Sequence, residues 1–194
     1  MTSLTVHNVR FYRDLEFSDY LKMPGYSFSW LKSGGQKIEP TPKMQLGTKV
    51  HTYLLSAREY LHEEGHELVR PLAVALKGIL SPVLRYCSPE LAVTADFVYQ
   101  GMVLHYKGRI DLPVLHYKSR LCVVIDIKVT EMDLRKSIDF FGYHNQINGY
   151  ALSIGAQRRV IISVNPKSGV TQVIPIAYTD EFWKRAVLKY GKPI

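Results

Sequence analysis

The chain has 194 residues, a formal net charge of +8 and a sequence isoelectric point of about 9.4, and 46% of its residues are hydrophobic. The length is sufficient for one domain with a full core, and the apolar content argues against a disordered chain. The basic balance is typical of proteins that bind phosphate polyanions, but many basic proteins bind no nucleic acid, so charge alone assigns no partner.

Turn-forming residues are frequent in the first part of the chain. We expect residues 1–43 to be an N-terminal extension that contains a short helix over 26–32, capped by Ser27. Beyond this extension, the pattern predicts a single domain that spans 44–194. No internal repeat or low-complexity tract divides it.

The apolar periodicity predicts the elements of the domain in a definite order. They are helices over 44–62 and 67–80, strands over 91–99, 102–116 and 121–129, a helix over 134–153, strands over 159–164 and 170–178, and a helix over 180–190. Pro82 is expected to end the second helix, Gly155 to end the third, and Thr179 to cap the last. This order predicts an α/β fold with a central mixed sheet flanked by helices.

Cysteine content and apolar runs limit the class of protein further. Cys87 and Cys122 lie far apart and form no CxxC pair, so we expect neither a disulfide framework nor an iron–sulfur cluster. The N-terminus lacks a basic segment followed by an apolar one, and no apolar run approaches the roughly 20 residues of a membrane span. The expected protein is soluble and cytoplasmic, with no membrane partner.

The strand predicted over 121–129 is unusual because its apolar run contains two charges. Asp126 and Lys128 lie at i and i+2, and therefore on one face of the strand. Their burial is unfavourable unless they meet a partner, a metal ion or solvent at the strand end. Taken alone, such a motif is more often a solvated strand end with an incidental ion pair.

A second carboxylate precedes this strand. Asp111, in the segment Gly108-Arg109-Ile110-Asp111, comes one strand–turn–strand interval before Asp126. If the two strands are adjacent and antiparallel, the carboxylates lie close together, and a divalent cation is the usual remedy for their repulsion. Taken alone, Asp111 is more often a turn aspartate.

Two predicted helices carry further polar side chains. His51 lies on the first, where a lone histidine is more often a packed or surface residue than a metal ligand. Gln146 and Tyr150 are at i and i+4 on the helix over 134–153, so they share a face and can donate hydrogen bonds to phosphate oxygens. The alternative is an ordinary helix in which Tyr150 is a core aromatic.

In combination, these segments resemble the RecB/RecE-type branch of the PD-(D/E)XK nuclease superfamily. That branch shows, in order, a Gly-x-x-x-His helix, Gly-x-x-Asp, Asp-x-Lys on a central strand, and Gln-x-x-x-Tyr on the next helix. The matching segments here are Gly47 to His51, Gly108 to Asp111, Asp126 to Lys128, and Gln146 to Tyr150. Ile110 stands where the family name has a proline, a departure that is common in this branch.

The chain is most similar to RecE-type, exonuclease VIII-like nucleases. It shares with them Tyr-Ser-x-Ser-x-Leu-Lys, from Tyr26 to Lys32, and Leu-Gly-Thr-x-x-His-x-x-Leu-Leu, from Leu46 to Leu55. The resemblance runs over about residues 20–178 and is specific in the combination of motifs rather than in any one of them.

The resemblance implies a restriction-endonuclease-like domain and a set of site residues. The implied catalytic residues are Glu90, Asp111, Asp126 and Lys128. The implied metal ligands are His51, Glu90, Asp111, Asp126 and the Ile127 carbonyl. The implied DNA contacts are Arg109, Arg135, Gln146 and Tyr150. The metal ion would be Mg²⁺, for which Mn²⁺ would substitute.

The activity implied by the resemblance is metal-dependent hydrolysis of linear double-stranded DNA from an end, for recombination or repair. Relatives of this kind are bacterial or phage-encoded, often form homo-oligomeric rings, and serve with a single-strand annealing protein. Two alternatives remain open: a single-strand or structure-specific nuclease of the same fold, and a catalytically inactive DNA-binding or scaffold protein. The cysteine content argues against the subtype with a four-cysteine iron–sulfur site.

Overall fold

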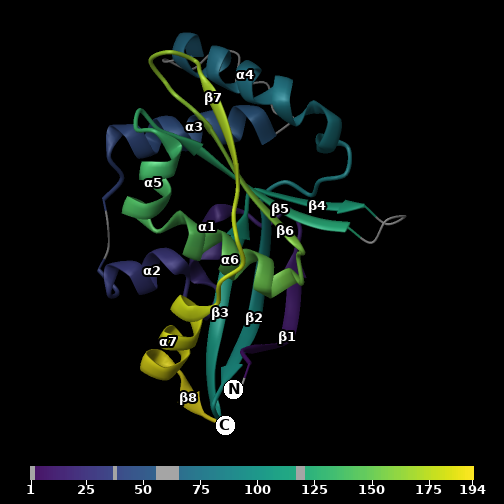
Figure 1. The fold of residues 1–194 in the computed structure, drawn as a ribbon, viewed down its shortest axis with the longest axis vertical. Coiled ribbons are helices and arrows are strands. Elements are labelled where there is room, and N and C mark those ends of the chain that lie inside the picture. Colours follow the sequence, from purple (N-terminus) through teal and green to yellow (C-terminus); the bar gives the residue numbers. More distant parts are fainter. Residues whose placement is uncertain (1–2, 37–38, 56–65, 117–120) are drawn as a thin grey trace.

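Asp111 marks a bend at which the chain passes from one β-sheet into another (Figure 1). The computed structural model describes residues 3–36, 39–55, 66–116 and 121–194. In this part of the chain, the first sheet has the order β1-β2-β3-β8 and the second the order β4-β5-β6-β7. The first sheet consists of β1 (Thr5–Tyr12), β2 (Leu91–Tyr99), β3 (Met102–Ile110) and β8 (Lys192–Pro193). The second consists of β4 (Leu112–His116), β5 (Leu121–Val129), β6 (Arg158–Val164) and β7 (Thr171–Pro175).

Strand direction differs between the two sheets. All pairs in the first sheet are antiparallel, whereas β5 and β6 run parallel in the second. Parallel neighbours need a crossover connection, and here it contains α5 (Leu134–Phe141) and α6 (Tyr143–Ile154). The predicted α/β class, with a mixed sheet flanked by helices, is confirmed, although the strands are divided between two sheets rather than gathered in one.

Helices cover β5 on both faces. Ile125 and Ile127 belong to one core cluster, together with side chains of α3 (Pro42–Leu55) and α4 (His66–Leu84). Val124 belongs to the other cluster, together with side chains of α5, α6 and α7 (Glu181–Tyr190). The apolar run of this strand therefore predicted its burial correctly. Among the residues described, no helix combines the length and apolar character needed to cross a lipid bilayer.

The first 43 residues, expected to form an extension, contribute directly to the first sheet. β1 pairs along most of its length with β2, and α1 (Phe17–Lys22) and α2 (Phe28–Ser33) follow it. The main chain of Tyr26 bonds to that of β3, and Ser27 caps α2, as predicted, by accepting from Trp30 N. The pattern of β1 did not predict a strand, because a register shift after His7 interrupts its alternation.

Three predicted helix boundaries differ from the structure. The helix expected over 134–153 is divided at Gly142, whose positive φ of 66° ends α5 and begins α6. α4 continues past Pro82 to Leu84, because Ser81 Oγ donates to the Gly78 carbonyl that proline leaves without its usual N–H partner. Asp180, not Thr179, precedes α7. The end of the helix expected over 44–62 lies partly outside the described residues, whereas Gly155 ends α6 as predicted.

Gly149 allows α6 to pack directly against α7. A Cβ built at this position would lie 2.2 Å from a ring carbon of Trp183, which is fully buried, whereas a Cβ at Gly78 of α4 would meet nothing within 4 Å. We expect Gly149→Ala to lower the free energy of unfolding by about 3 kcal/mol through overpacking. Gly78→Ala, the matched control, should raise it by about 0.5–1 kcal/mol through helix propensity. Urea denaturation measures both, and equal midpoints for the two variants would contradict this account of the packing.

Candidate active site

Asp126 is a carboxylate with almost no solvent contact. It lies on β5, is 1% exposed, and among the described residues neither of its carboxylate oxygens has a hydrogen-bond donor. Nζ of Lys128 nevertheless lies 2.7 Å from Oδ2, in an ion pair that partly compensates the charge of this carboxylate. With Asp111 beside it, the site contains two buried carboxylates and one ammonium, so a further cation would reduce the remaining repulsion.

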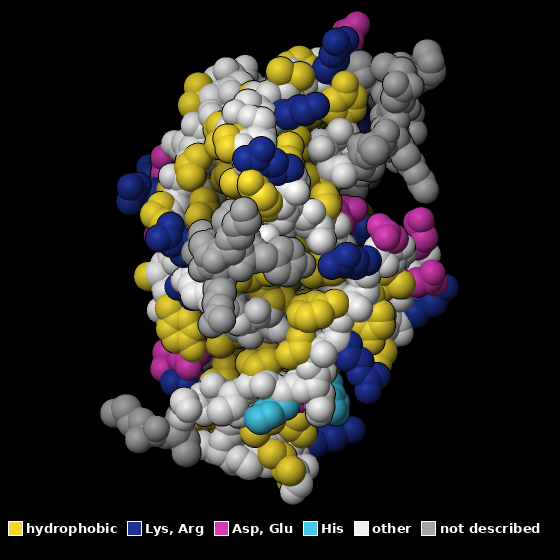
Figure 2. Space-filling model, turned by 90° about the vertical axis from the view of Figure 1, so that its right-hand side faces the viewer, with side chains coloured by type: hydrophobic (Ala, Val, Ile, Leu, Met, Phe, Trp, Pro, Cys, Tyr) yellow, Lys and Arg dark blue, Asp and Glu magenta, His cyan; other side chains and the backbone are white. Residues whose placement is uncertain are grey.

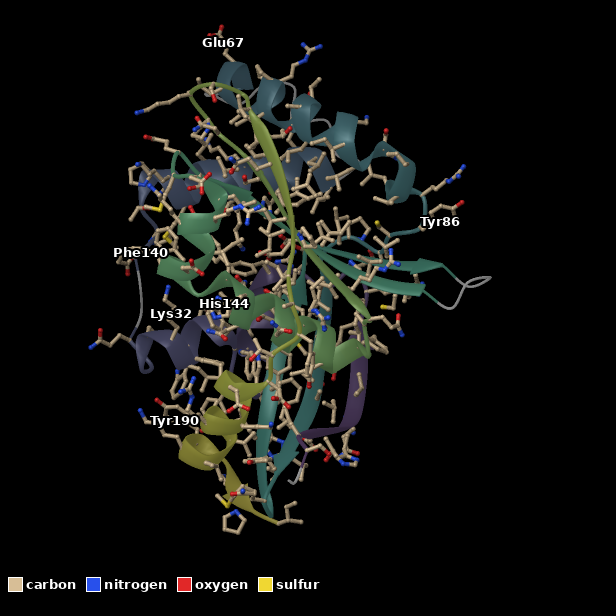
Figure 3. All side chains as sticks on the ribbon, viewed as in Figure 1. Lys32, Glu67, Tyr86, Phe140, His144 and Tyr190 are labelled. Atoms are coloured by element: carbon tan, nitrogen blue, oxygen red, sulfur yellow. The ribbon has the colours of Figure 1, made fainter. Side chains whose placement is uncertain are left out.

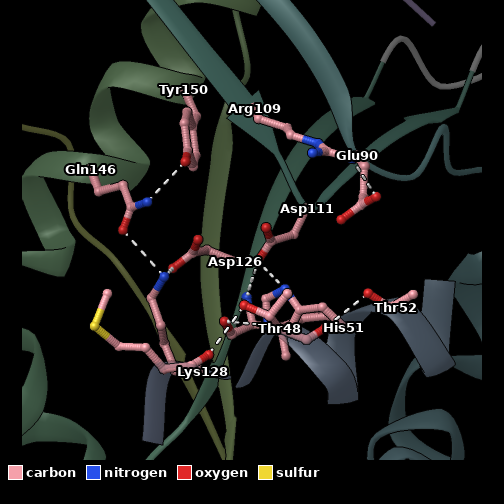
Figure 4. Close-up of polar contacts among 12 residues, drawn as sticks. Thr48, His51, Thr52, Glu90, Arg109, Asp111, Asp126, Lys128, Gln146 and Tyr150 are labelled. Atoms are coloured by element: carbon pink, nitrogen blue, oxygen red, sulfur yellow. Dashed lines mark hydrogen bonds and ion pairs between the residues drawn. The ribbon is translucent and has the colours of Figure 1, made fainter. Parts of the chain in front are cut away.

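Asp111 approaches the same strand from the bend between the sheets. Leu112 pairs with Ile125, so Asp111 and Asp126 are neighbours across the last step of the β4–β5 pair. Asp111 Oδ2 accepts a hydrogen bond of 2.8 Å from Ile127 N. Figure 4 shows the two carboxylates side by side, so the predicted juxtaposition of these acids is confirmed.

His51 reaches this group from α3. Its Nε2 lies 3.0 Å from the Ile127 carbonyl oxygen, and its Nδ1 lies 3.7 Å from Asp111 Oδ2 (Figure 4). The helical turn that carries His51 is held on the sheet by Val50, which is fully buried in the core cluster below β5. His51 is therefore neither a surface residue nor an isolated core histidine, but a neighbour of both acidic strands.

A chain of polar contacts leads from Lys128 into α6. Lys128 Nζ donates to Gln146 Oε1 at 3.2 Å, and Gln146 Nε2 donates to the Tyr150 hydroxyl at 2.8 Å. The i, i+4 spacing therefore places Gln146 and Tyr150 on one face, as predicted. Tyr150 is only 7% exposed and belongs to the core, so its hydroxyl holds the Gln146 amide from the core side. A direct contact between Tyr150 and DNA stays a prediction.

Tyr143 is a member of the site that the motifs did not identify. Lys128 Nζ lies 4.6 Å from the centre of its ring, a cation–π contact that holds the ammonium from a second side. Tyr143 precedes Gln146 by three positions on α6, so both side chains can face β5. An aromatic at i−3 from Gln146 was the available signal.

Glu90 and Arg109 form an ion pair at the edge of the site. Arg109 Nη2 lies 2.7 Å from Glu90 Oε2, and the Arg109 guanidinium lies 5.2 Å from the ring centre of Phe17. Glu90 has a positive φ of 53°, and its N–H donates to the Asp111 carbonyl at 2.9 Å. Glu90 is thus tied to the bend that carries Asp111, and Arg109 has intramolecular partners in addition to any role toward DNA.

Arg135 lies apart from this cluster, exposed on the first turn of α5. Lys and Arg side chains are scattered over the face shown in Figure 2 and do not gather there in one patch. The positive charge of the chain therefore indicates no single nucleic-acid path on that face.

Burial and mutual charge shift the protonation of the central groups. Burial raises the pKa of Asp126 to about 6, despite the adjacent Lys128 ammonium, and also raises that of Asp111. Burial lowers the pKa of His51, and the positive charge of Lys128 adds to the effect. Burial alone would lower the Lys128 pKa, but the charges of Asp126 and Asp111 outweigh it and raise the pKa. At neutral pH the imidazole is uncharged and the ammonium is protonated.

The donor atoms fit a hard divalent cation. Asp126 offers carboxylate oxygens whose close partner among the described residues is the Lys128 ammonium, and the neutral imidazole of His51 has a lone pair. Nε2 of His51 and the Ile127 oxygen are 3.0 Å apart; two adjacent ligands with bonds of about 2.1 Å at right angles are separated by about 3.0 Å. Among the described residues, no three His, Cys, Asp or Glu side chains form a ready ligand cluster. Main-chain and water ligands would complete the coordination, as is usual for Mg²⁺.

Comparisons with known proteins leave the chain without an assigned family. No family model matches the sequence, and no curated protein matches it. Among solved structures, the chain is similar to the crystal structure of SSO0001, with 16% sequence identity and a TM-score of 0.44, over 90% of this chain and 84% of that chain. A likeness at this level says nothing about activity.

The raised pKa of Asp126 predicts how the free energy of unfolding changes with pH. In the unfolded chain the Asp126 carboxyl loses its proton at about pH 4, whereas in the folded protein it keeps the proton up to about pH 6. The contribution of Asp126 to the free energy of unfolding therefore falls as the pH rises between these two values. Asp126→Asn keeps the shape without the charge. In EDTA, we expect the free energy of unfolding of the variant, relative to wild type, to rise by about 2–3 kcal/mol between about pH 4 and about pH 7, because only the wild type loses stability as this carboxyl ionises. The variant also loses the ion pair with Lys128, which shifts the difference by a similar amount throughout this range. A difference between the two proteins that stays constant over this pH range would contradict this.

Proposed function

We propose that this chain is a metal-dependent deoxyribonuclease that hydrolyses phosphodiester bonds of linear double-stranded DNA from an end. One observation carries the proposal: two buried acids, Asp126 and Asp111, share one site with His51, and among the described residues the Lys128 ammonium is the close cationic partner of Asp126. Burial and mutual charge shift the pKa values of Asp126, Asp111 and His51, and a cluster of buried acids and a histidine with shifted pKa values is typical of binding and catalytic sites. The ordered motifs that resemble RecE-type nucleases support the same activity.

Asp111, Asp126, His51 and the Ile127 carbonyl would hold a Mg²⁺ or Mn²⁺ ion. When bound, such an ion polarises a phosphate and makes a coordinated water more acidic. Lys128 restrains the Asp126 carboxylate, and Ile127 N–H restrains the Asp111 carboxylate. The side chains are therefore positioned before the substrate binds, which reduces reorganisation during the reaction.

Lys128 would orient the attacking water and offset negative charge on the phosphate. Its ammonium is held by Asp126, Gln146 and the Tyr143 ring, so its position is defined on three sides. The raised pKa of Lys128 keeps it protonated at neutral pH, and a protonated amine can donate hydrogen bonds but cannot act as a base. Its role is thus positioning and charge stabilisation rather than proton abstraction.

Glu90 would bind a second metal ion or a water at the edge of the site. Its carboxylate is now paired with Arg109, and that guanidinium would have to release or share it for a second ion to be bound. The second candidate function, a single-strand or structure-specific nuclease, uses the same residues. The recombination or repair role, the annealing partner and the ring assembly derive only from the motif resemblance.

Asp126→Asn and Lys128→Ala test the chemistry. We expect Mg²⁺-dependent degradation of linear plasmid to fall by at least about 100-fold in both variants, because one loses a metal ligand and the other a charge-stabilising group. Asp96→Asn is the matched control, because this carboxylate is paired with Asn8 and His105 on the first sheet. Normal cutting by Asp126→Asn, or equal loss in Asp96→Asn, would overturn the assignment. Stable DNA binding without cutting by wild type would indicate the inactive scaffold.

Substrate form decides between the two nuclease functions. We expect end-labelled linear duplex to be degraded in Mg²⁺, whereas covalently closed circular duplex remains intact, because an enzyme that starts at ends has no end to engage. Preferential degradation of single strands would favour the second candidate function. Cutting of closed circles would show an endonuclease and exclude the proposed mode of attack.

A further inference from the structure

A series of aromatic rings leads from Lys128 to the surface of the molecule. The Lys128 ammonium lies over Tyr143, the Tyr143 ring stacks on Phe141 at 5.3 Å with an interplanar angle of 23°, and Phe140 meets Phe141 edge-on at 4.9 Å. These rings belong to the α5–α6 junction, and consecutive members touch. We call Phe140, Phe141 and Tyr143 the aromatic series.

Phe140, at the outer end of the aromatic series, is the most exposed aromatic side chain in the described part of the chain, at 73%. α5 buries Leu134, Ser137 and Ile138 on its inner face, so Phe140 lies on the outer face, where a polar residue would be expected. An exposed ring that continues a stacked series is not explained by packing of the core. It is available for contact with another planar group.

Gly142 gives the aromatic series its shape. Its left-handed φ of 66° ends α5 and begins α6, so the chain turns between Phe141 and Tyr143. An uninterrupted helix would separate successive side chains by about 100° around its axis. The turn instead stacks Phe141 on Tyr143 and directs the series away from β5 towards solvent.

The ammonium of Lys32 lies beside the aromatic series, next to Phe141. Lys32 of α2 places Nζ 5.3 Å from the centre of the Phe141 ring and donates to the Phe141 carbonyl at 2.8 Å. Figure 3 shows Lys32 and Phe140 on the same side of the molecule. An ammonium has three donors, and the carbonyl takes one of them, so others can meet a phosphate. Rings that stack on bases, next to a cation that binds the backbone, are how proteins hold single strands.

We propose that the aromatic series binds the unpaired end of a DNA strand, with Phe140 stacked on a base, Lys32 on a backbone phosphate, and the strand leading to Lys128. The inference rests on the proposed nuclease function, because the strand is held next to that centre. Two observations argue for this occupant: the series is continuous with the catalytic lysine, and the cation at its side complements the phosphate charge. A duplex has its bases stacked internally, so only an unpaired or frayed end can use the surface.

The test is equilibrium binding of fluorescent oligonucleotides by the full chain in EDTA. We expect Phe140→Ala to bind a single strand, or a duplex with a single-stranded tail, about 10-fold more weakly than wild type. Blunt duplex should bind both proteins alike. Phe140→Trp should retain wild-type affinity. Tyr178→Ala, the matched control, removes another exposed aromatic that lies beside a cation, Arg159, and should have no effect.

An abasic nucleotide moved along the tail provides a second measurement. At one position of the tail, the abasic nucleotide should weaken binding by wild type about as much as Phe140→Ala does. At that position it should not weaken binding by Phe140→Ala any further, because the stacking of the base on Phe140 is already absent in this variant. Unchanged affinity in Phe140→Ala, no position whose effect depends on Phe140, or no strand binding at all would overturn the proposal. Degradation of linear duplex in Mg²⁺ by wild type and Asp126→Asn reports separately on the nuclease function. Strand binding through Phe140 without cutting would leave this inference standing and remove the other.

Discussion

The hydrogen bond from Ile127 N to Asp111 Oδ2 joins the two sheets at the point where their strands diverge. β4 pairs with β5 only as far as Leu112 and Ile125, so no residue of β4 stands opposite Ile127. The Ile127 N–H therefore has no main-chain acceptor on β4, and the Asp111 carboxylate accepts its hydrogen bond instead. The bend between the sheets therefore also fixes the position of Asp111. The other residues of the site lie around this carboxylate.

Around this bond, charge rather than apolar packing shapes the centre of the fold. Asp126 and Lys128 lie near the end of the otherwise apolar strand β5, and Asp111 lies beside them, so two carboxylates share one ammonium. Such a group reduces the stability of the folded protein unless a ligand neutralises it. The rest of the domain compensates with two extensive apolar clusters on the opposite faces of β5.

Features that depend on local pattern could be predicted from the sequence. The aliphatic run of β5, the Ser27 cap and the grouping of Asp111, Asp126, His51 and Lys128 follow from periodicity, capping chemistry and the order of motifs. The pattern did not predict β1, because the irregular register after His7 interrupts its alternation. It also missed the turn at Gly142, since glycine is tolerated inside helices and only tertiary contacts decide whether it breaks one. Tyr143 could have been predicted from its i−3 spacing to Gln146, but no motif pointed to it.

The pairing of β1 with β2 has a consequence for how the chain acquires its structure. Thr5 pairs with Val98, and Tyr12 with Ala92, so β1 is synthesised well before its partner and stays unpaired until α1 to α4 have also been made. Contacts between such distant segments are slow to form, because a long loop must close before any of its pairing is gained. During that interval the main-chain groups of β1 can pair with other chains, which exposes the nascent protein to aggregation.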